Sequence, residues 1–372
     1  MSPLVWAEID LGNLRRNLKV IRSLLANRRT EILAVVKADA YGHGMERIAR
    51  VLYDEGVRFF GVANIEEAAQ LRAVCRRARI LVLGSFREDQ LPHYIRHRIC
   101  PTVSSLEDVR HLVKALGPAA LLFPVHVKID TGMGRLGVWH EDAPHFFQKI
   151  LLHHGLIVEG VYTHFSRADH ADRAFTERQL ELFDASVRAI RSLGFSPKYF
   201  HAANSLGLVR FKKSHFNLVR PGILLYGIHP GPGPAPAGIR PILSLKTRIA
   251  FLKEVRKGRA FSYGATHTAG RDTRVATLPI GYSHGYRVGF SNKAFVVIRG
   301  HKCPVIGRVT MDQTLVDVGH VPAVRRWDEV TVIGSEGRSQ VSAADLAAIS
   351  QTIPYEIVCS IHSRIPRVYK DI

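Results

Sequence analysis

Short apolar runs alternate with amphipathic segments along residues 31–223, and this rhythm constrains the fold more than any other feature of the chain. A short run rich in Val, Ile, Leu and Phe is typical of a buried parallel strand, and the segments between the runs have helical spacing. Because eight such units follow one another in under 240 residues, they predict a closed (β/α)8 barrel rather than an open sheet. The predicted strands are residues 32–36, 59–63, 80–83, 100–103, 125–129, 158–164, 199–203 and 218–223.

Helical patterns precede and separate these strands. The first helix is expected to begin after Asp10, whose carboxylate is a good N-cap, and to run to Leu25. The strands at 100–103 and 218–223 are weakly marked, because each contains a proline. Further helices are predicted at 65–75, 106–116 and 176–193.

A segment rich in proline and glycine, residues 230–238, can hold neither a helix nor a strand interior. We therefore predict two domains, a barrel over residues 1–238 and a mostly β domain over residues 239–372. Two short helices are expected in the second domain, at 343–349 and near Tyr355. Its predicted strands, separated by glycine and proline turns, are residues 242–255, 274–280, 294–298, 304–309, 313–318 and 329–333.

The composition excludes several classes of protein. Apolar residues make up 46% of the chain and charged residues 23%, as in soluble globular proteins. No run of about 18 apolar residues exists, so no membrane span is predicted, and the charged start of the chain does not suit a signal peptide. Cys75, Cys100, Cys303 and Cys359 form no CxxC pair, so neither a metal site nor a disulfide framework is expected. Buried free thiols in a reducing cytoplasm are predicted instead.

The net charge of +20, from 52 Lys and Arg against 32 Asp and Glu, raises the question of nucleic acid binding. The basic residues are scattered, and no nucleic-acid-binding module is recognisable. The nearest to a patch, Arg72, Arg76, Arg77 and Arg79, fits a solvated helix face. We therefore predict no nucleic acid partner, and the positive field suits an anionic cofactor or substrate.

The first predicted strand ends in Lys37, and a glycine-rich turn follows, with Tyr41, Gly42 and Gly44. Burial lowers the pKa of a lysine at a strand end, and the free amine can then act as a base or a Schiff-base nucleophile. A hydroxyl and two flexible backbone positions beside it suit a phosphate-bearing ligand. The alternative is a solvated lysine with no chemical role.

Two further candidates follow predicted strands. Arg135 lies in a glycine-rich loop and can bind a carboxylate with two hydrogen bonds, although pairing with a surface acid is the alternative. His164 ends the sixth strand, where a satisfied core histidine is the alternative.

The ends of the seventh and eighth strands often form the phosphate site of a barrel. Asn204 and Ser205 lie at the first of these ends, and Arg220, Gly222 and Ile223 at the second. The Ser205 hydroxyl, with the backbone N–H groups of Gly222 and Ile223, fits phosphate binding. For Arg220, a structural ion pair is the alternative.

Residues 34–44 closely resemble the pyridoxal phosphate lysine motif of alanine racemases, and residues 128–137 resemble a second, ten-residue motif of that family. The resemblance implies pyridoxal phosphate as cofactor, with Lys37 as the Schiff-base lysine. It also implies that Tyr41 hydrogen-bonds the cofactor phosphate.

The resemblance also assigns roles to other residues of the barrel. Lys128 matches a lysine that is commonly carbamylated in the family and holds the arginine, here Arg135, in place. His164 matches a histidine that orients a catalytic tyrosine. Arg220 matches the partner of the pyridine nitrogen, where a cation opposes protonation, weakens the electron sink and discourages transamination.

Three positions of the second domain follow from the same resemblance. Residues 261–266 resemble the second-base motif, so Tyr263 is the expected second acid–base group. Met311 matches the residue that offers its backbone N–H to the substrate carboxylate. Tyr355 matches a tyrosine that binds the phosphate.

Residues 278–286 resemble the segment that gates the substrate in the family, which makes Tyr282 a candidate for substrate binding. The family usually has Ala-Asp where Ser283 and His284 stand. This departure affects the predicted entry channel rather than the predicted chemistry.

An alanine racemase would use Lys37 and Tyr263 on opposite faces of the substrate Cα, one removing a proton and the other returning one. The resemblance implies D-alanine for peptidoglycan as product, and a head-to-tail homodimer in which Tyr263 comes from the partner subunit. A broad-specificity amino acid racemase of the same fold is the alternative. The Tyr263 segment and residues 128–137 argue against a decarboxylase, and the second domain argues against a non-catalytic pyridoxal phosphate carrier.

Overall fold

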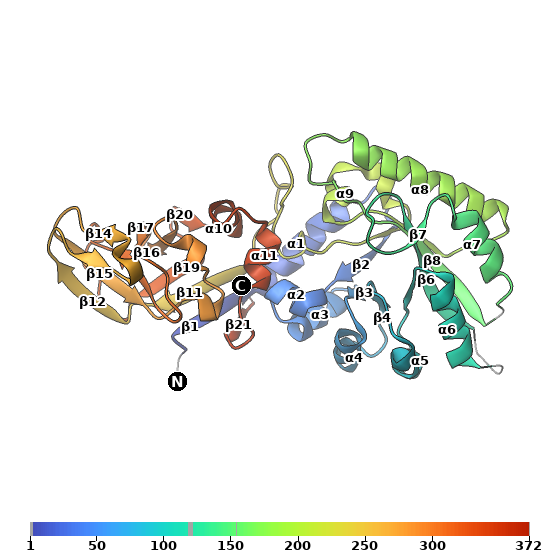
Figure 1. The fold of residues 1–372 in the computed structure, drawn as a ribbon, viewed down its shortest axis with the longest axis horizontal. Helices are drawn as coiled ribbons and strands as arrows, with labels where there is room; N and C mark the ends of the chain where they lie inside the picture. The colour runs from blue at the N-terminus through green and yellow to red at the C-terminus, as the bar shows by residue number, and fades with distance from the viewer. Residues whose placement is uncertain (1–2, 118–121, 154, 372) are drawn as a thin grey trace.

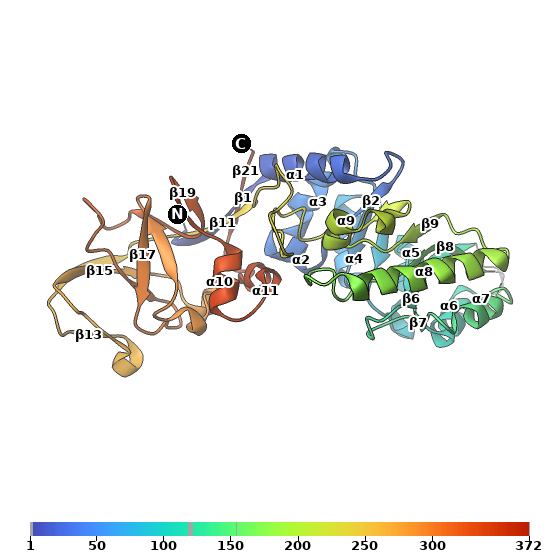
Figure 2. The same ribbon diagram turned by 90° about the horizontal axis from the view of Figure 1, so that it is seen from above.

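The computed structural model describes residues 3–117, 122–153 and 155–371. Two bodies lie end to end along the longest axis (Figure 1). One is a barrel of strands and helices, coloured from blue to yellow, and the other is a sheet-rich body mostly in orange and red, which also contains the blue β1 and the yellow β11. The view from above shows the same separation (Figure 2).

In the described part of the chain, eight parallel strands close the barrel, which confirms the predicted fold class. A bridge between Leu81 and Cys100 joins the third strand of the ring to the fourth. The Arg220 N–H donates to the Ala203 carbonyl (2.9 Å), which joins the seventh strand to the eighth. The ring consists of β2 (Glu31–Val35), β3 (Phe59–Val62), β4 (Arg79–Val82), β5 (Thr102–Val103), β6 (Phe123–Asp130), β8 (Leu156–Tyr162), β9 (Tyr199–His201) and β10 (Leu218–Val219), while the short β7 (Val138–Trp139) pairs with β6.

Helices cover the outside of the barrel, and the predicted ones are confirmed within two residues at each end. Asp10 caps the first of them, because its Oδ1 accepts from the Asn13 N–H (2.7 Å). None of the helices in the described ranges is long and apolar enough to cross a membrane. The helices are α1 (Leu11–Leu24), α3 (Met45–Asp54), α4 (Ile65–Val74), α5 (Leu91–His97), α6 (Leu106–Leu116), α7 (Ala143–Ile150), α8 (Ala174–Ser192) and α9 (Ser205–Arg210).

The sheet-rich body is built on a ten-stranded sheet. Both predicted helices are present, as α10 (Ala343–Ile349) and α11 (Pro354–Cys359). The short β13 (Ala260–Phe261) and β14 (His267–Thr268) form a separate hairpin. The strands of the sheet are β1 (Val5–Asp10), β11 (Leu243–Arg248), β12 (Phe251–Val255), β15 (Thr273–Leu278), β16 (Phe295–Ile298), β17 (His301–Ile306), β18 (Thr314–Asp317), β19 (Glu329–Glu336), β20 (Ser339–Val341) and β21 (Arg367–Lys370).

The prediction of one strand over residues 242–255 is wrong, because the structure has two. The Ile249 N–H donates to the Asp328 carbonyl (3.0 Å), and the Ala250 N–H donates to the Thr277 carbonyl (2.9 Å). At this point the chain leaves β19, the partner of β11, and joins β15, the partner of β12. The apolar pattern continues through the break, so it does not reveal the change of partner.

The strand β1 was not predicted, and it links the two bodies. It precedes the barrel in sequence but lies in the second sheet, antiparallel to β11 and parallel to β21. Residues 230–238 contain no helix or strand, as predicted. The domain boundary between residues 238 and 239 stays a prediction, and β1 crosses it.

The four cysteines are free, and Cys75, Cys100 and Cys303 are buried as predicted. The prediction is wrong for Cys359, which is exposed. It follows Ile357 and Val358, which are buried, and the next position of α11 turns toward solvent.

Candidate functional site

A cavity of about 380 Å³ lies at the C-terminal ends of the barrel strands, where a barrel of this kind carries its chemistry. Side chains from several barrel strands meet there with one from α11 of the second body. Eleven of the fourteen site residues predicted from the sequence line the cavity: Lys37, Tyr41, Lys128, Arg135, His164, Asn204, Ser205, Arg220, Gly222, Ile223 and Tyr355.

Lys37 begins a left-handed turn, α2 (Lys37–Gly42), in the segment predicted as a glycine-rich turn. Residues 38–41 have φ between 52° and 54° and ψ between 40° and 52°. An L-residue in this conformation costs roughly 1–2 kcal/mol, so neighbouring contacts must hold the turn in place. The turn directs Lys37 and Tyr41 into the same cavity.

His43 holds this turn from behind. Its Nδ1 lies 2.8 Å from the carbonyl oxygens of both Ala40 and Tyr41, and because both are acceptors, Nδ1 carries the hydrogen. The ring stacks on Tyr226, whose hydroxyl donates to the Val35 carbonyl (2.8 Å). Burial lowers the pKa of His43 to about 4, so the ring stays neutral.

The cavity gathers cationic side chains, and this lowers the proton affinity of its two amines. Burial, followed by the charge of Arg135, lowers the pKa of Lys37. Burial and the charges of Arg135 and Arg220 lower the pKa of Lys128 to about 8. A neutral amine can act as a nucleophile or a base, and it is also the form that can be carbamylated.

The carboxylate of Asp130 shapes the loop that presents Arg135. Its Oδ1 accepts from the N–H groups of Gly132 and Met133, both at 2.8 Å, and its Oδ2 accepts from the Arg135 N–H (3.3 Å). The guanidinium of Arg135 forms no ion pair with a carboxylate among the described residues. It is therefore free to bind an anionic group in the cavity.

Arg220 is buried and held by backbone carbonyls. Its Nη2 donates to the carbonyls of Thr163 (2.7 Å) and Ala202 (3.0 Å), and its Nη1 donates to the His201 carbonyl (3.0 Å). Burial lowers the pKa of Arg220 to about 10, and the group remains a cation at neutral pH. It has no carboxylate partner within the described ranges, which removes the alternative of a structural ion pair.

Ser205 and Gly222 lie together, but their hydrogen bonds differ from the prediction. The Gly222 N–H donates to Ser205 Oγ (2.9 Å) instead of pointing to a ligand, which leaves the serine hydroxyl hydrogen as the donor. Asn204 caps α9, since its Oδ1 accepts from the Gly207 N–H (2.8 Å). A Cβ on Gly222 would lie 2.4 Å from Tyr41 Oη, so only glycine leaves room for that hydroxyl.

Two family models together match nearly the whole chain: "Alanine racemase, N-terminal domain" over residues 9–230 and "Alanine racemase, C-terminal domain" over residues 242–369. The chain belongs to the alanine racemase family. The predicted resemblance and fold class are thereby confirmed.

Individual alanine racemases agree with the family models. The alanine racemase of Halothermothrix orenii is 40% identical over 367 residues, which cover 98% of this chain and 97% of the relative. The crystal structure of alanine racemase from E. faecalis has a TM-score of 0.93 and 30% identity, over 99% of this chain and 98% of that one. An alanine racemase structure from Bartonella henselae, described as having covalently bound pyridoxal phosphate, has a TM-score of 0.91 and 28% identity, over 99% of this chain and all (100%) of that one.

Three residues that the racemase motifs predicted lie outside the cavity. Tyr263, Tyr282 and Met311 belong to the sheet-rich body, and 71%, 46% and 54% of their surfaces are exposed. Tyr263 follows β13, which lies at the end of the molecule far from the barrel (Figure 2). Tyr282 and Met311 are close together, because the Tyr282 N–H donates to the Thr310 carbonyl (3.1 Å). Within one chain, the racemase motifs therefore form two separate groups.

Sequence reasoning missed Tyr162, which also lines the cavity. Its ring centroid lies 5.1 Å from the Arg220 guanidinium carbon, and its hydroxyl shares a hydrogen bond with Thr102 (2.9 Å). The sequence contained the necessary indication. Tyr162 stands two residues before His164, and alternate residues of a strand face the same side, so Tyr162 is expected on the side of His164.

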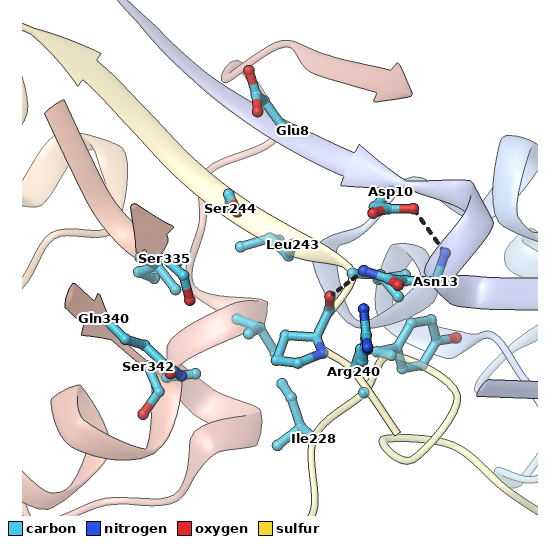
Figure 3. Close-up of a pocket in the computed structure, with 18 of the residues that line it drawn as sticks. Glu8, Asp10, Asn13, Ile228, Arg240, Leu243, Ser244, Ser335, Gln340 and Ser342 are labelled. Atoms are coloured by element: carbon cyan, nitrogen blue, oxygen red, sulfur yellow. Dashed lines mark hydrogen bonds between the residues drawn. The ribbon is translucent and has the colours of Figure 1, made fainter. Parts of the chain in front are cut away.

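A second cavity, of about 470 Å³, lies where the two bodies join (Figure 3). None of the fourteen predicted site residues is among the described residues that line it. The carboxylate of Asp10 is already bound to the Asn13 N–H. The polar side chains that face this cavity include Asp10, Asn13 and Arg240 on the barrel side and Ser335, Gln340 and Ser342 on the side of the second sheet.

Proposed function

We infer that this chain interconverts L-alanine and D-alanine with pyridoxal phosphate as its cofactor, and that it supplies D-alanine for peptidoglycan synthesis. The observation that carries this function is the match of both alanine racemase domain models within one chain. A broad-specificity amino acid racemase of the same fold is the alternative.

The cavity fits pyridoxal phosphate. When bound, the cofactor supplies an electron sink for the pair left at the substrate Cα after proton loss. Tyr41, Ser205 and Tyr355 would bind the phosphate, in a cradle that a Cβ on Gly222 would fill. Arg220 would present a cation to the pyridine nitrogen, which keeps that nitrogen unprotonated.

The residues of this chain bind the substrate and move its proton. Lys37, whose lowered pKa favours the free amine, exchanges a proton with Cα on one face. Tyr263 of the partner subunit does the same on the other face, oriented by His164. Arg135 binds the substrate carboxylate together with the N–H of Met311 of the partner subunit, and Tyr282 of the partner subunit lies at the entrance.

We propose a head-to-tail homodimer in which each cavity is completed by Tyr263, Tyr282 and Met311 of the partner subunit. These three residues are exposed and lie outside the chain's own cavity. Two bases on opposite faces of Cα are needed to give either enantiomer, and Tyr263, the expected second base, does not line the cavity of its own chain. The dimer therefore supplies the second base that the cavity of a single chain lacks.

We also propose that the enzyme acts in the cytoplasm. Its free thiols at Cys75, Cys100 and Cys303 are suited to a reducing compartment. The proposal includes no nucleic acid or membrane partner, since the basic residues of the sequence form no binding module.

The proposed function predicts that purified protein loaded with pyridoxal phosphate converts L-alanine into D-alanine far faster than other L-amino acids. The measurement is the quantity of each D-product, separated by chiral chromatography. Comparable rates with several amino acids would favour the broad-specificity alternative, and no D-product from any of them would contradict both.

The cradle beside Tyr41 predicts that Gly222→Ala weakens cofactor binding. Because overpacking by a methyl group costs about 1–3 kcal/mol, we expect the dissociation constant of pyridoxal phosphate to rise about tenfold. Absorbance titration of cofactor-free protein measures it. A matched control is Gly270→Ala, because a Cβ at Gly270 would contact nothing within 4 Å. Equal affinity for the two variants would contradict the proposed position of the phosphate.

A further inference from the structure

A column of buried polar groups runs through the barrel interior away from the cavity, starting at Arg220. Arg220 Nη1 lies 2.8 Å from His201 Nδ1, and His201 Nε2 lies 2.9 Å from His126 Nδ1. At the far end, His126 Nε2 lies 3.8 Å from a carboxylate oxygen of Glu159. Both histidines are fully buried. Neither His126 nor Glu159 lines the cavity.

The hydrogen positions in this column follow from the chemistry of arginine, which can only donate. His201 Nδ1 must therefore accept, and the hydrogen of this neutral ring lies on Nε2. That hydrogen is donated to His126 Nδ1, so His126 in turn carries its hydrogen on Nε2. Burial lowers the pKa of both histidines, which keeps both rings neutral. Every hydrogen in the column therefore points from Arg220 toward Glu159.

The direction of these hydrogens shows whether the cluster at the far end of the column is a metal site or part of a hydrogen-bonded chain. One ligand atom each from Cys100, His126 and Glu159 lies within 4.8 Å of the others, a spacing that could hold a metal ion. A metal would need a lone pair on His126, and the only one of this neutral ring is already accepting from His201. The His126 Nε2–H instead faces the Glu159 carboxylate, 3.8 Å away, and makes no hydrogen bond within the described residues.

We propose that His126 and Glu159 are positioning residues for Arg220. They fix His201 as a hydrogen-bond acceptor, which holds the guanidinium in the cavity by a side-chain contact in addition to its carbonyl contacts. The proposal rests on the proposed function, in which the cation of Arg220 faces the pyridine nitrogen. Without an acceptor at position 126, His201 can adopt the other tautomer, with its hydrogen on Nδ1. The Nδ1–H of His201 and the guanidinium of Arg220 would then both be donors and would repel each other.

The first test reads the hydrogen positions directly. Solid-state nitrogen-15 spectra of the full-length enzyme, labelled at histidine and loaded with cofactor, distinguish protonated from bare ring nitrogens. The His201→Asn and His126→Asn variants assign the signals by difference. We expect hydrogen on Nε2 of both rings. A His126 ring with hydrogen on Nδ1, or one zinc ion per chain that is lost in Cys100→Ser, would overturn the proposal in favour of a metal site.

The second test compares two replacements of His126. Asparagine offers an amide oxygen that can accept from His201, whereas leucine offers no acceptor. Transamination leaves the amino group of alanine on the cofactor and releases pyruvate, so pyruvate formed per alanine racemised reports the position of the Arg220 cation. We expect this ratio to rise about tenfold in His126→Leu, the scale of one lost hydrogen bond to a charged group, and to rise less than about threefold in His126→Asn.

Two outcomes would contradict a positioning role. One is an equal ratio of pyruvate formed to alanine racemised in the two His126 variants. The other is a ratio in His126→Leu that is the same as in the wild type. If His126→Leu does not fold, Glu159→Leu provides the same test, because it removes the acceptor that faces His126 Nε2 at the end of the column, and an unchanged ratio there would contradict the proposal. Wild-type protein without racemase activity would refute the proposed function, while the tautomer measurement would still stand.

Discussion

Racemisation is expected to slow by about 100- to 10,000-fold when Tyr263 is replaced by phenylalanine, the range that one general acid–base group contributes. The reason is that Lys37 serves only one face of the substrate Cα, and a second group must exchange the proton on the other. The loss should fall unequally on the two enantiomers. The proton that faces Lys37 should still exchange with solvent, and the proton of the other enantiomer should exchange slowly.

Deuterium incorporation from heavy water, starting from each alanine enantiomer separately, measures this asymmetry. Tyr53→Phe is a matched control, because this tyrosine lies on α3 and its ring contacts Arg58, away from the cavity. Equal and mild slowing of both exchange reactions would count against a two-base scheme.

Mixing two inactive variants is expected to restore activity. Homodimers of Lys37→Ala lack one base at both sites, and homodimers of Tyr263→Phe lack the other. In a mixed dimer, one site combines Lys37 of one subunit with Tyr263 of the partner subunit and is intact. Random exchange makes about half of the dimers mixed, with one intact site of two, so activity can reach about one quarter of wild type.

The activity of the mixture, compared with each variant alone, provides the measurement, and fluorescently labelled subunits confirm that exchange occurred. Mixing two Lys37→Ala preparations is the control, because no combination of them restores a site. Confirmed exchange without regained activity would mean that both residues act within one chain, and the proposed shared site would be wrong.

The barrel and the cavity could be predicted because the patterns and motifs that indicate them are formed by contiguous residues. Each βα unit has its own apolar pattern, and the residues from Ala34 to Gly44 and from Lys128 to Gly137 form unbroken motifs. The barrel topology then brings the C-terminal ends of the strands together, so residues as distant as Lys37 and Arg220 meet without further information.

The features that escaped prediction depend on partners far away in the chain. The left-handed turn after Lys37 needs His43 stacked on Tyr226, and no local pattern indicates such a turn in a run containing alanines. The hydrogen-bonded pair of His126 and His201 joins two strands of the barrel interior. The strand β1 is recognisable as a strand only once β11 and β21 are in place.

The position of β1 has a consequence for the order in which the protein is made. Residues 5–10 leave the ribosome before the barrel, but the strands on both sides of them, β11 and β21, are made only after the whole barrel. The nascent chain must therefore keep this segment, with its apolar Val5, Ala7 and Ile9, unpaired while the barrel forms. During that time both edges of the segment are open to pairing with other chains, a hazard for unpaired strands in general. A ribosome-associated chaperone that covers this segment would shorten its exposure.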